Sequence, residues 1–114
     1  MKRIVVILFA AMAIHSWAAD TAVKGHLIDV ACSASKARKG SASGHGRNCL
    51  RMSTCAGSGY GVLTEDRQFI KFDKDSNEKA VKFLSEITKD SDIKVTVHGS
   101  VNGDTITVSK IELQ

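Results

Sequence analysis

The sequence predicts an all-β domain with one helix, and two observations lead to this fold class. Short segments of alternating apolar and polar residues are separated by glycine and turn residues, a pattern typical of half-buried strands. A single segment late in the chain instead has apolar residues at helical spacing. The resulting order, β-β-β-α-β-β, is that of an OB-fold-like five-stranded barrel. An open, twisted sheet with one packed helix is the alternative architecture.

The start of the chain has the features of a secretory signal peptide, over residues 1–18. Two cations precede an apolar run at residues 4–14, and the small residues Ser16 and Ala18 follow at the positions that signal peptidases prefer. We therefore expect cleavage after Ala18 and an exported protein, periplasmic or secreted, with no stable membrane anchor after cleavage. The remaining residues, 19–114, are predicted to form a single OB-like domain.

The five predicted strands are rich in β-branched and aromatic residues and end at turn signals. They cover residues 21–30, 60–64, 68–73, 92–101 and 104–113. In the last two, alternation places five apolar residues on the buried face. These residues are Ile93, Val95, Val97, Ile106 and Val108. Between the two strands, Asn102 and Gly103 predict a two-residue hairpin turn.

The predicted helix covers residues 76–89 and lies between the third and fourth strands. Asp75 is the expected N-cap, and Glu78 completes a capping box three residues later. Four apolar residues then fall on one face at helical spacing. They are Ala80, Val81, Leu84 and Ile87. We expect this face to close the bottom of the barrel.

The residues between the first two strands differ from the rest of the chain. This segment, from Cys32 to Cys55, is called the cysteine stretch because it holds all three cysteines. It also holds five cations, Lys36, Arg38, Lys39, Arg47 and Arg51. No acid occurs between Asp29 and Glu65, so the positive charge of the chain is concentrated here. Since the loop between strands one and two binds ligands in OB-folds, we expect the functional site in this stretch.

The chain resembles a group of small exported bacterial proteins that have OB-like folds and no established activity. The resemblance extends over nearly the whole exported part of the chain. The matching features are Asp29-x-x-Cys32, His45-x-x-x-Cys49, Cys55, the segment at residues 58–64 (SGYGVLT), and the closing hairpin from Val97-His98-Gly99 to Ile111. The resemblance implies a fold and a site, and it does not supply a reaction.

A metal site is the leading interpretation of the cysteine stretch. Cys32, His45, Cys49 and Cys55 form a Cys3His set, a combination that zinc accepts in tetrahedral sites. If the segment is helical from its histidine onward, His45 and Cys49 share one helix face at i, i+4. Met52 follows on the same stripe as a candidate additional ligand. Thiolate, thioether and imidazole donors suit copper as well as zinc.

A disulfide is the structural alternative, because small exported domains often use one to fix a flexible loop. Cys32–Cys49 would close a long loop and Cys49–Cys55 a short one, and the latter requires a helix break near Ser53. In this alternative the domain is a disulfide-stapled interaction module. Its five loop cations would bind an anionic partner, although they also suit an ordinary solvated surface.

Catalysis is not predicted. Arg47 and Arg51 flank Cys49 and would favour a thiolate. However, the sequence has no redox CxxC, no CxxCH haem motif and no evident Ser/His/Asp set. Nucleic acid is not an expected partner either, because the few aromatic residues are needed in the core rather than for base stacking. The sequence therefore predicts a non-enzymatic binding module.

Overall fold

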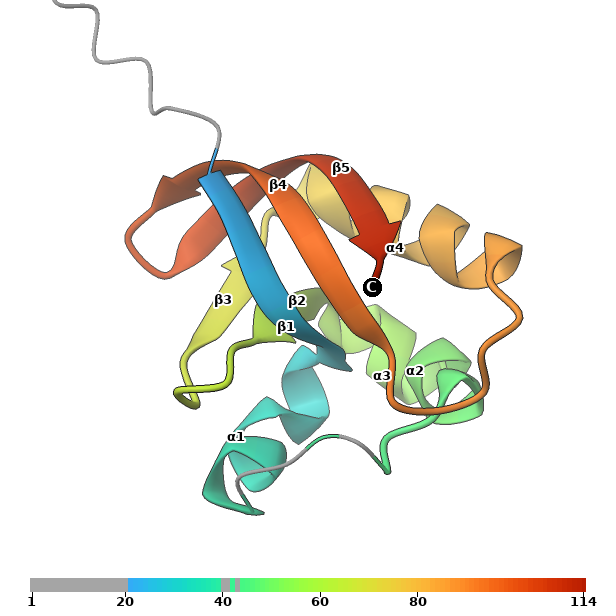
Figure 1. The fold of residues 1–114 in the computed structure, drawn as a ribbon. Helices are drawn as coiled ribbons and strands as arrows, with labels where there is room; N and C mark the ends of the chain where they lie inside the picture. Colours follow the sequence, from blue (N-terminus) through green and yellow to red (C-terminus); the bar gives the residue numbers. More distant parts are fainter. Residues whose placement is uncertain (1–20, 40–41, 43) are drawn as a thin grey trace, which may run out of the picture.

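A computed structural model describes residues 21–39, 42 and 44–114 (Figure 1). The predicted signal peptide lies outside the described residues, as do the side chains of Arg38 and Lys39. Among the helices of the described part, none is both long and apolar enough to cross a membrane.

The five strands form a mixed, closed sheet. They are β1 (Thr21–Asp29), β2 (Tyr60–Leu63), β3 (Phe69–Phe72), β4 (Lys94–Asn102) and β5 (Thr105–Leu113). Each strand pairs with two others, so the sheet closes in the order β1-β2-β3-β5-β4. Strands β3 and β5 are parallel and the other pairs are antiparallel. The prediction of a mostly β domain is confirmed.

The prediction of a single helix was wrong, since the described residues contain four. They are α1 (Val30–Lys39), α2 (Arg47–Arg51), α3 (Ser53–Ser58) and α4 (Lys74–Glu86). The first three lie between β1 and β2 and form what we call the three-helix insert, residues 30–59, which contains the cysteine stretch. In Figure 1 these helices gather at one end of the sheet, while α4 lies against β5. Helices α1 and α3 are rich in Ser and Ala, and α2 has only five residues, so the sequences of all three resemble loop.

The main hydrophobic core lies inside the barrel and continues to α4 and α2. Its buried members are Leu27, Leu50, Tyr60, Val62, Phe72, Ala80, Leu84, Ile93, Val95, Val97, Ile106 and Val108. All five residues predicted to face inward from the last two strands are among them. A second, smaller cluster of Ile28, Ala42 and Leu63 lies against Cys32 and Phe69. The insert therefore contacts apolar residues on both sides of β1.

Two details of α4 differ from the prediction. Its N-cap is Asp73 rather than Asp75, because the Asp73 carboxylate accepts hydrogen bonds from the Ser76 amide at 2.9 Å and the Thr107 hydroxyl at 2.6 Å. The second bond fixes the start of the helix to β5. Val81 is 51% exposed, whereas Leu84 is buried. A helix turns by about 100° per residue, so the buried face that includes Leu84 leaves Val81 on its outer margin.

The hairpin between β4 and β5 is shifted by one residue from its predicted position. Asn102 pairs with Thr105, so the turn residues are Gly103 and Asp104. Gly103 has a φ of 64°, and among described non-glycine residues only Arg67 and Asp92 have positive φ. A two-residue turn of this kind places its glycine first, which explains why Asn102 remains in the strand.

Candidate metal centre

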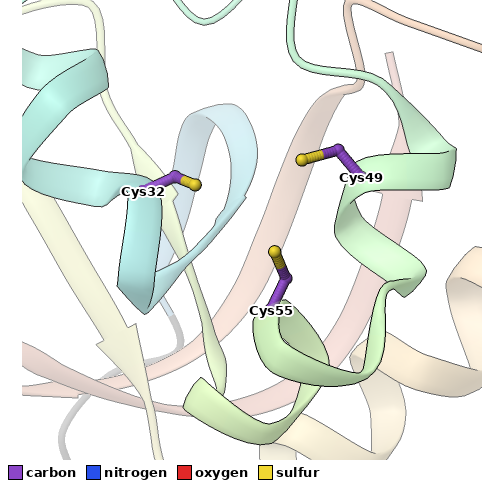
Figure 2. A group of neighbouring side chains, drawn as sticks. All are labelled: Cys32, Cys49 and Cys55. Carbon is purple, nitrogen blue, oxygen red and sulfur yellow. The ribbon is translucent and has the colours of Figure 1, made fainter.

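The three cysteines come from three different helices and converge. Cys32 lies on α1, Cys49 on α2 and Cys55 on α3. Figure 2 shows their side chains pointing toward a common space between these helices. The three sulfur atoms all lie within 4.8 Å of one another. Each cysteine is a free thiol in this structure. The geometry gathers three soft donors, separated by up to 23 residues of sequence, at one point.

A break in the backbone at Met52 brings Cys49 and Cys55 together. Met52 has φ −61° and ψ 141°, an extended conformation that ends α2 and begins α3. On one continuous helix, residues six positions apart would point in different directions. The break turns α3 back toward α2, so both thiols face the same space. The Met52 side chain itself is 56% exposed.

Asp29 and His45 form a buried pair beside Cys32. The Asp29 side chain is fully buried, and one of its oxygens lies 2.8 Å from His45 Nε2. Its other oxygen accepts a hydrogen bond from the Cys32 amide at 3.1 Å, as an N-cap residue does. Asp29, Cys32 and His45 also place their ligand atoms within 4.8 Å of one another. Cys32 therefore belongs to two overlapping groups.

The arrangement differs from the predicted Cys3His set. His45 joins Asp29 and Cys32, and the four predicted ligands do not form one group within 4.8 Å. Helix α2 begins at Arg47, and the preceding Gly46 is extended, so His45 and Cys49 do not share a helix face. The i, i+4 argument was therefore wrong. The glycines on either side of His45 keep it outside the helix, where it reaches Asp29 instead.

Buried polar contacts attach α2 to the barrel. The hydroxyl of Tyr60, at the start of β2, donates a hydrogen bond of 2.7 Å to the Leu50 carbonyl. Both side chains are at most 1% exposed and belong to the main core. Leu50 is adjacent to Cys49, so these two contacts fix the position of that thiol. An apolar anchor and a hydrogen bond together hold a helix of only five residues.

Arg47 attaches the other side of the insert to the segment after α4. Its guanidinium donates to the Ile87 carbonyl at 2.5 Å and to Asp90 at 3.2 Å. Its amide donates to the Asp90 carbonyl at 2.7 Å, and the adjacent Gly46 bridges to Ser91. Arg47 is one of the five cations predicted to bind an anion, and in this structure its guanidinium also holds α2 in position.

The end of α3 is bonded to the start of α1. The Val30 amide donates to the Gly59 carbonyl at 2.9 Å, and the Ala31 amide donates to the Ser58 hydroxyl at 3.2 Å. That hydroxyl in turn donates to the Cys55 carbonyl at 2.6 Å. Gly59 has a φ of 86°, which favours glycine at this helix end. These bonds bring the Cys32 and Cys55 ends of the two helices together.

Burial keeps two of the thiols protonated in the absence of a ligand. It raises the pKa of Cys32 to about 11, and the nearby Asp29 carboxylate adds to this effect. The pKa of Cys55 is raised by burial and then by the charge of Asp29. Reactive cysteines in enzymes have lowered pKa values. A raised pKa disfavours the thiolate, which is the form that acts as a nucleophile and also the form that binds a metal, so a bound ion would have to displace these protons.

The other residues that were predicted for the site lie at different places in the insert. Arg51 is exposed at the end of α2, and Lys36 is half-buried on α1. The side chains of Arg38 and Lys39 lie outside the described residues.

Asp29 was absent from the predicted ligand set. Its signal in the sequence was its place three residues before Cys32, the spacing of an N-cap to the amide it binds.

Comparison of the chain with family models, curated proteins and solved structures found no match. The interpretation of the site therefore depends on its own residues.

Proposed function

We propose that this protein is an exported, non-enzymatic OB-like module that binds a soft metal ion, zinc or copper, through its three cysteines. The observation that carries this proposal is the convergence of Cys32, Cys49 and Cys55 within 4.8 Å. Sulfur ligands of one ion with bonds of about 2.3 Å lie roughly 4 Å apart, a separation that falls within this limit. Three helices with little apolar surface of their own gain a common centre when an ion is bound.

The strand order supports the OB-like assignment. The five strands close into a barrel in the order β1-β2-β3-β5-β4, with a helix between β3 and β4, and an OB-fold is likewise a small five-stranded barrel. The insert occupies the connection between β1 and β2, a position used for ligands in such barrels. Export is supported by the signal-like residues 1–18 of the sequence.

Metal loading tests the proposal. The purified, fully reduced protein is incubated without oxygen with zinc or with monovalent copper and passed through a desalting column. Native mass spectrometry then counts bound ions. We expect one ion per chain in the wild type and none in the triple variant C32S/C49S/C55S. Absence of both metals from the wild type would reject the proposal.

The second candidate is a disulfide-stapled module that binds an anionic partner. It is favoured by the same proximity, because Cys49 and Cys55 face each other across the break at Met52. The exposed Arg51 and the half-buried Lys36 would then contact the partner. Counting thiols under denaturing conditions, in protein taken directly from the exported compartment, separates the candidates. One free thiol supports the disulfide, whereas three support the metal site.

A further inference from the structure

We infer that the cysteine cluster is a three-coordinate, all-thiolate site for monovalent copper, and that Asp29 and His45 position Cys32 without coordinating the ion. This inference rests on the proposed soft-metal function and names its ligand.

The number of metal-binding side chains at the site favours copper over zinc. Three sulfur atoms lie within 4.8 Å of one another. Within the described part of the chain, no histidine or carboxylate meets this limit with all three sulfurs, since Asp29 and His45 meet it through Cys32 alone. Closed zinc sites in proteins are almost always four-coordinate. A set of three thiolates with no fourth side chain instead suits copper in its monovalent state, which soft sulfur ligands favour.

The side chains of Asp29 and His45 already bond to each other. The Asp29 carboxylate is fully buried, bonded to His45 at 2.8 Å and to the Cys32 amide at 3.1 Å. Coordination through His45 Nε2 would leave a buried carboxylate without its partner, which is costly, and His45 forms no group within 4.8 Å with all three sulfurs. The pair is therefore suited to an outer-shell role, in which it fixes the backbone and orientation of a ligating residue.

The net charge of the copper complex follows from the bonds that form. When one Cu⁺ binds three thiols, three Cu–S bonds form, three protons leave to solvent and no electron is transferred. The site then carries a net charge of −2. Cys32 lies in the first turn of α1, where the helix dipole stabilises negative charge. The buried Asp29 carboxylate beside Cys32 opposes this charge. The helix dipole and Asp29 therefore act in opposite directions, and the Cu–S bonds themselves have to supply the free energy of deprotonation.

The three cysteines differ in their exposure to solvent. Cys55 is 8% exposed, whereas Cys32 and Cys49 are half-buried. An ion bound here is shielded on the barrel side and can be approached from solvent through two of its three ligands. Thiol ligands of an incoming donor or acceptor can therefore add to a three-coordinate ion. This geometry suits an ion that is carried and passed on.

X-ray absorption at the copper edge tests the inference on the wild-type protein. Reduced protein is loaded without oxygen with one equivalent of monovalent copper. We expect three sulfur neighbours and no nitrogen neighbour. A spectrum with nitrogen coordination would overturn the inference. So would a four-coordinate zinc complex that includes His45 in protein that does not retain copper, although soft-metal binding itself would then stand. Failure to bind either metal would reject the proposed function as well.

Variants separate ligands from positioning residues. Each of C32S, C49S and C55S should lower copper affinity by more than the roughly 10- to 100-fold that loss of an outer-shell partner costs. H45Q should fall within that range and keep one copper with three sulfur neighbours. H98Q, which removes an imidazole from β4, is the matched control and should leave affinity unchanged. Loss of a nitrogen neighbour in H45Q would show that His45 is a ligand and overturn the inference.

Discussion

The barrel and the three-helix insert are held together by different means. The barrel buries a continuous set of apolar side chains, from Leu27 on β1 to Val108 on β5. The insert contributes Leu50 to that core and Ala42 and Cys32 to a smaller apolar cluster. It is also positioned by individual polar contacts of Asp29, Arg47 and Ser58. Its own centre is a group of three thiols. The barrel should therefore fold without a ligand, while the order of the insert should depend on what its cysteines bind.

Removal of the metal ligands should produce the largest effect. With free metal at 1,000 times the dissociation constant, binding adds about 4 kcal/mol to the free energy of unfolding. We expect this gain in the wild type and its loss in C55S, measured by urea unfolding with and without metal. M52L is the control, because the exposed Met52 should contribute nothing. An equal gain in C55S would contradict the account.

A core substitution should destabilise the barrel without changing the metal site. Leu84 on α4 is 1% exposed and packs in the main core. L84A should lower the free energy of unfolding by about 3 kcal/mol, because it removes buried apolar surface and leaves a cavity. Copper stoichiometry should remain one per chain. If L84A also lost its metal, the barrel and the insert would not be separable as described.

Tyr60 connects the two regions, and its hydroxyl should matter to both. Y60F leaves the buried Leu50 carbonyl without its partner, which should cost about 2 kcal/mol of unfolding free energy. Hydrogen exchange should show the loss of protection first in α2. A uniform loss across all strands would mean that this bond does not specifically hold the insert.

Asp73 gives a pH-dependent contribution on the barrel side. Hydrogen bonds from Ser76 and from Thr107 hold the pKa of the Asp73 carboxyl below its ordinary value. A lowered pKa in the folded state adds stability above the unfolded pKa of about 3.9, and this contribution is lost as pH falls through the folded value. D73A should cost about 1 kcal/mol at neutral pH. The difference in melting temperature should shrink below about pH 4, and a constant difference would contradict this assignment.

Val81 should have the smallest effect. Its side chain is 51% exposed on the outer margin of α4. V81A should change the free energy of unfolding by no more than about 0.5 kcal/mol, as is usual for surface substitutions. The same denaturant titration used for L84A provides the comparison. A loss similar to that of L84A would mean that the buried face of α4 is wider than its exposure indicates.

The comparison also explains which features the sequence could predict. Strand alternation is a local signal, so the inward residues of β4 and β5, such as Val97 and Ile106, were predicted correctly. The short helices of the insert are fixed by distant partners, such as Tyr60 for α2 and Asp90 for Arg47, and no local pattern reveals them. The N-cap of α4 was misplaced for a similar reason, because Thr107 on β5 selects Asp73 over Asp75.

The site was predicted in part. Residue type and the predicted export indicated that the cysteines belong together, but their convergence depends on the backbone break at Met52. The prediction that His45 shares a helix face with Cys49 was wrong, because helical spacing was extended across Gly46, which is not helical. Asp29 was overlooked as a site residue because it belongs to the strand and its partners lie in the insert. Such contacts become visible only when both segments are placed in space.

Alkylation of the thiols during metal titration tests the central claim most directly. The reduced protein is titrated without oxygen with monovalent copper, treated briefly with iodoacetamide, and the modification of each cysteine is measured by mass spectrometry. The account predicts that Cys32, Cys49 and Cys55 become protected together, completely at one copper per chain. Protection of only one or two of them at that ratio, with the third still fully reactive, would contradict a single site formed by all three.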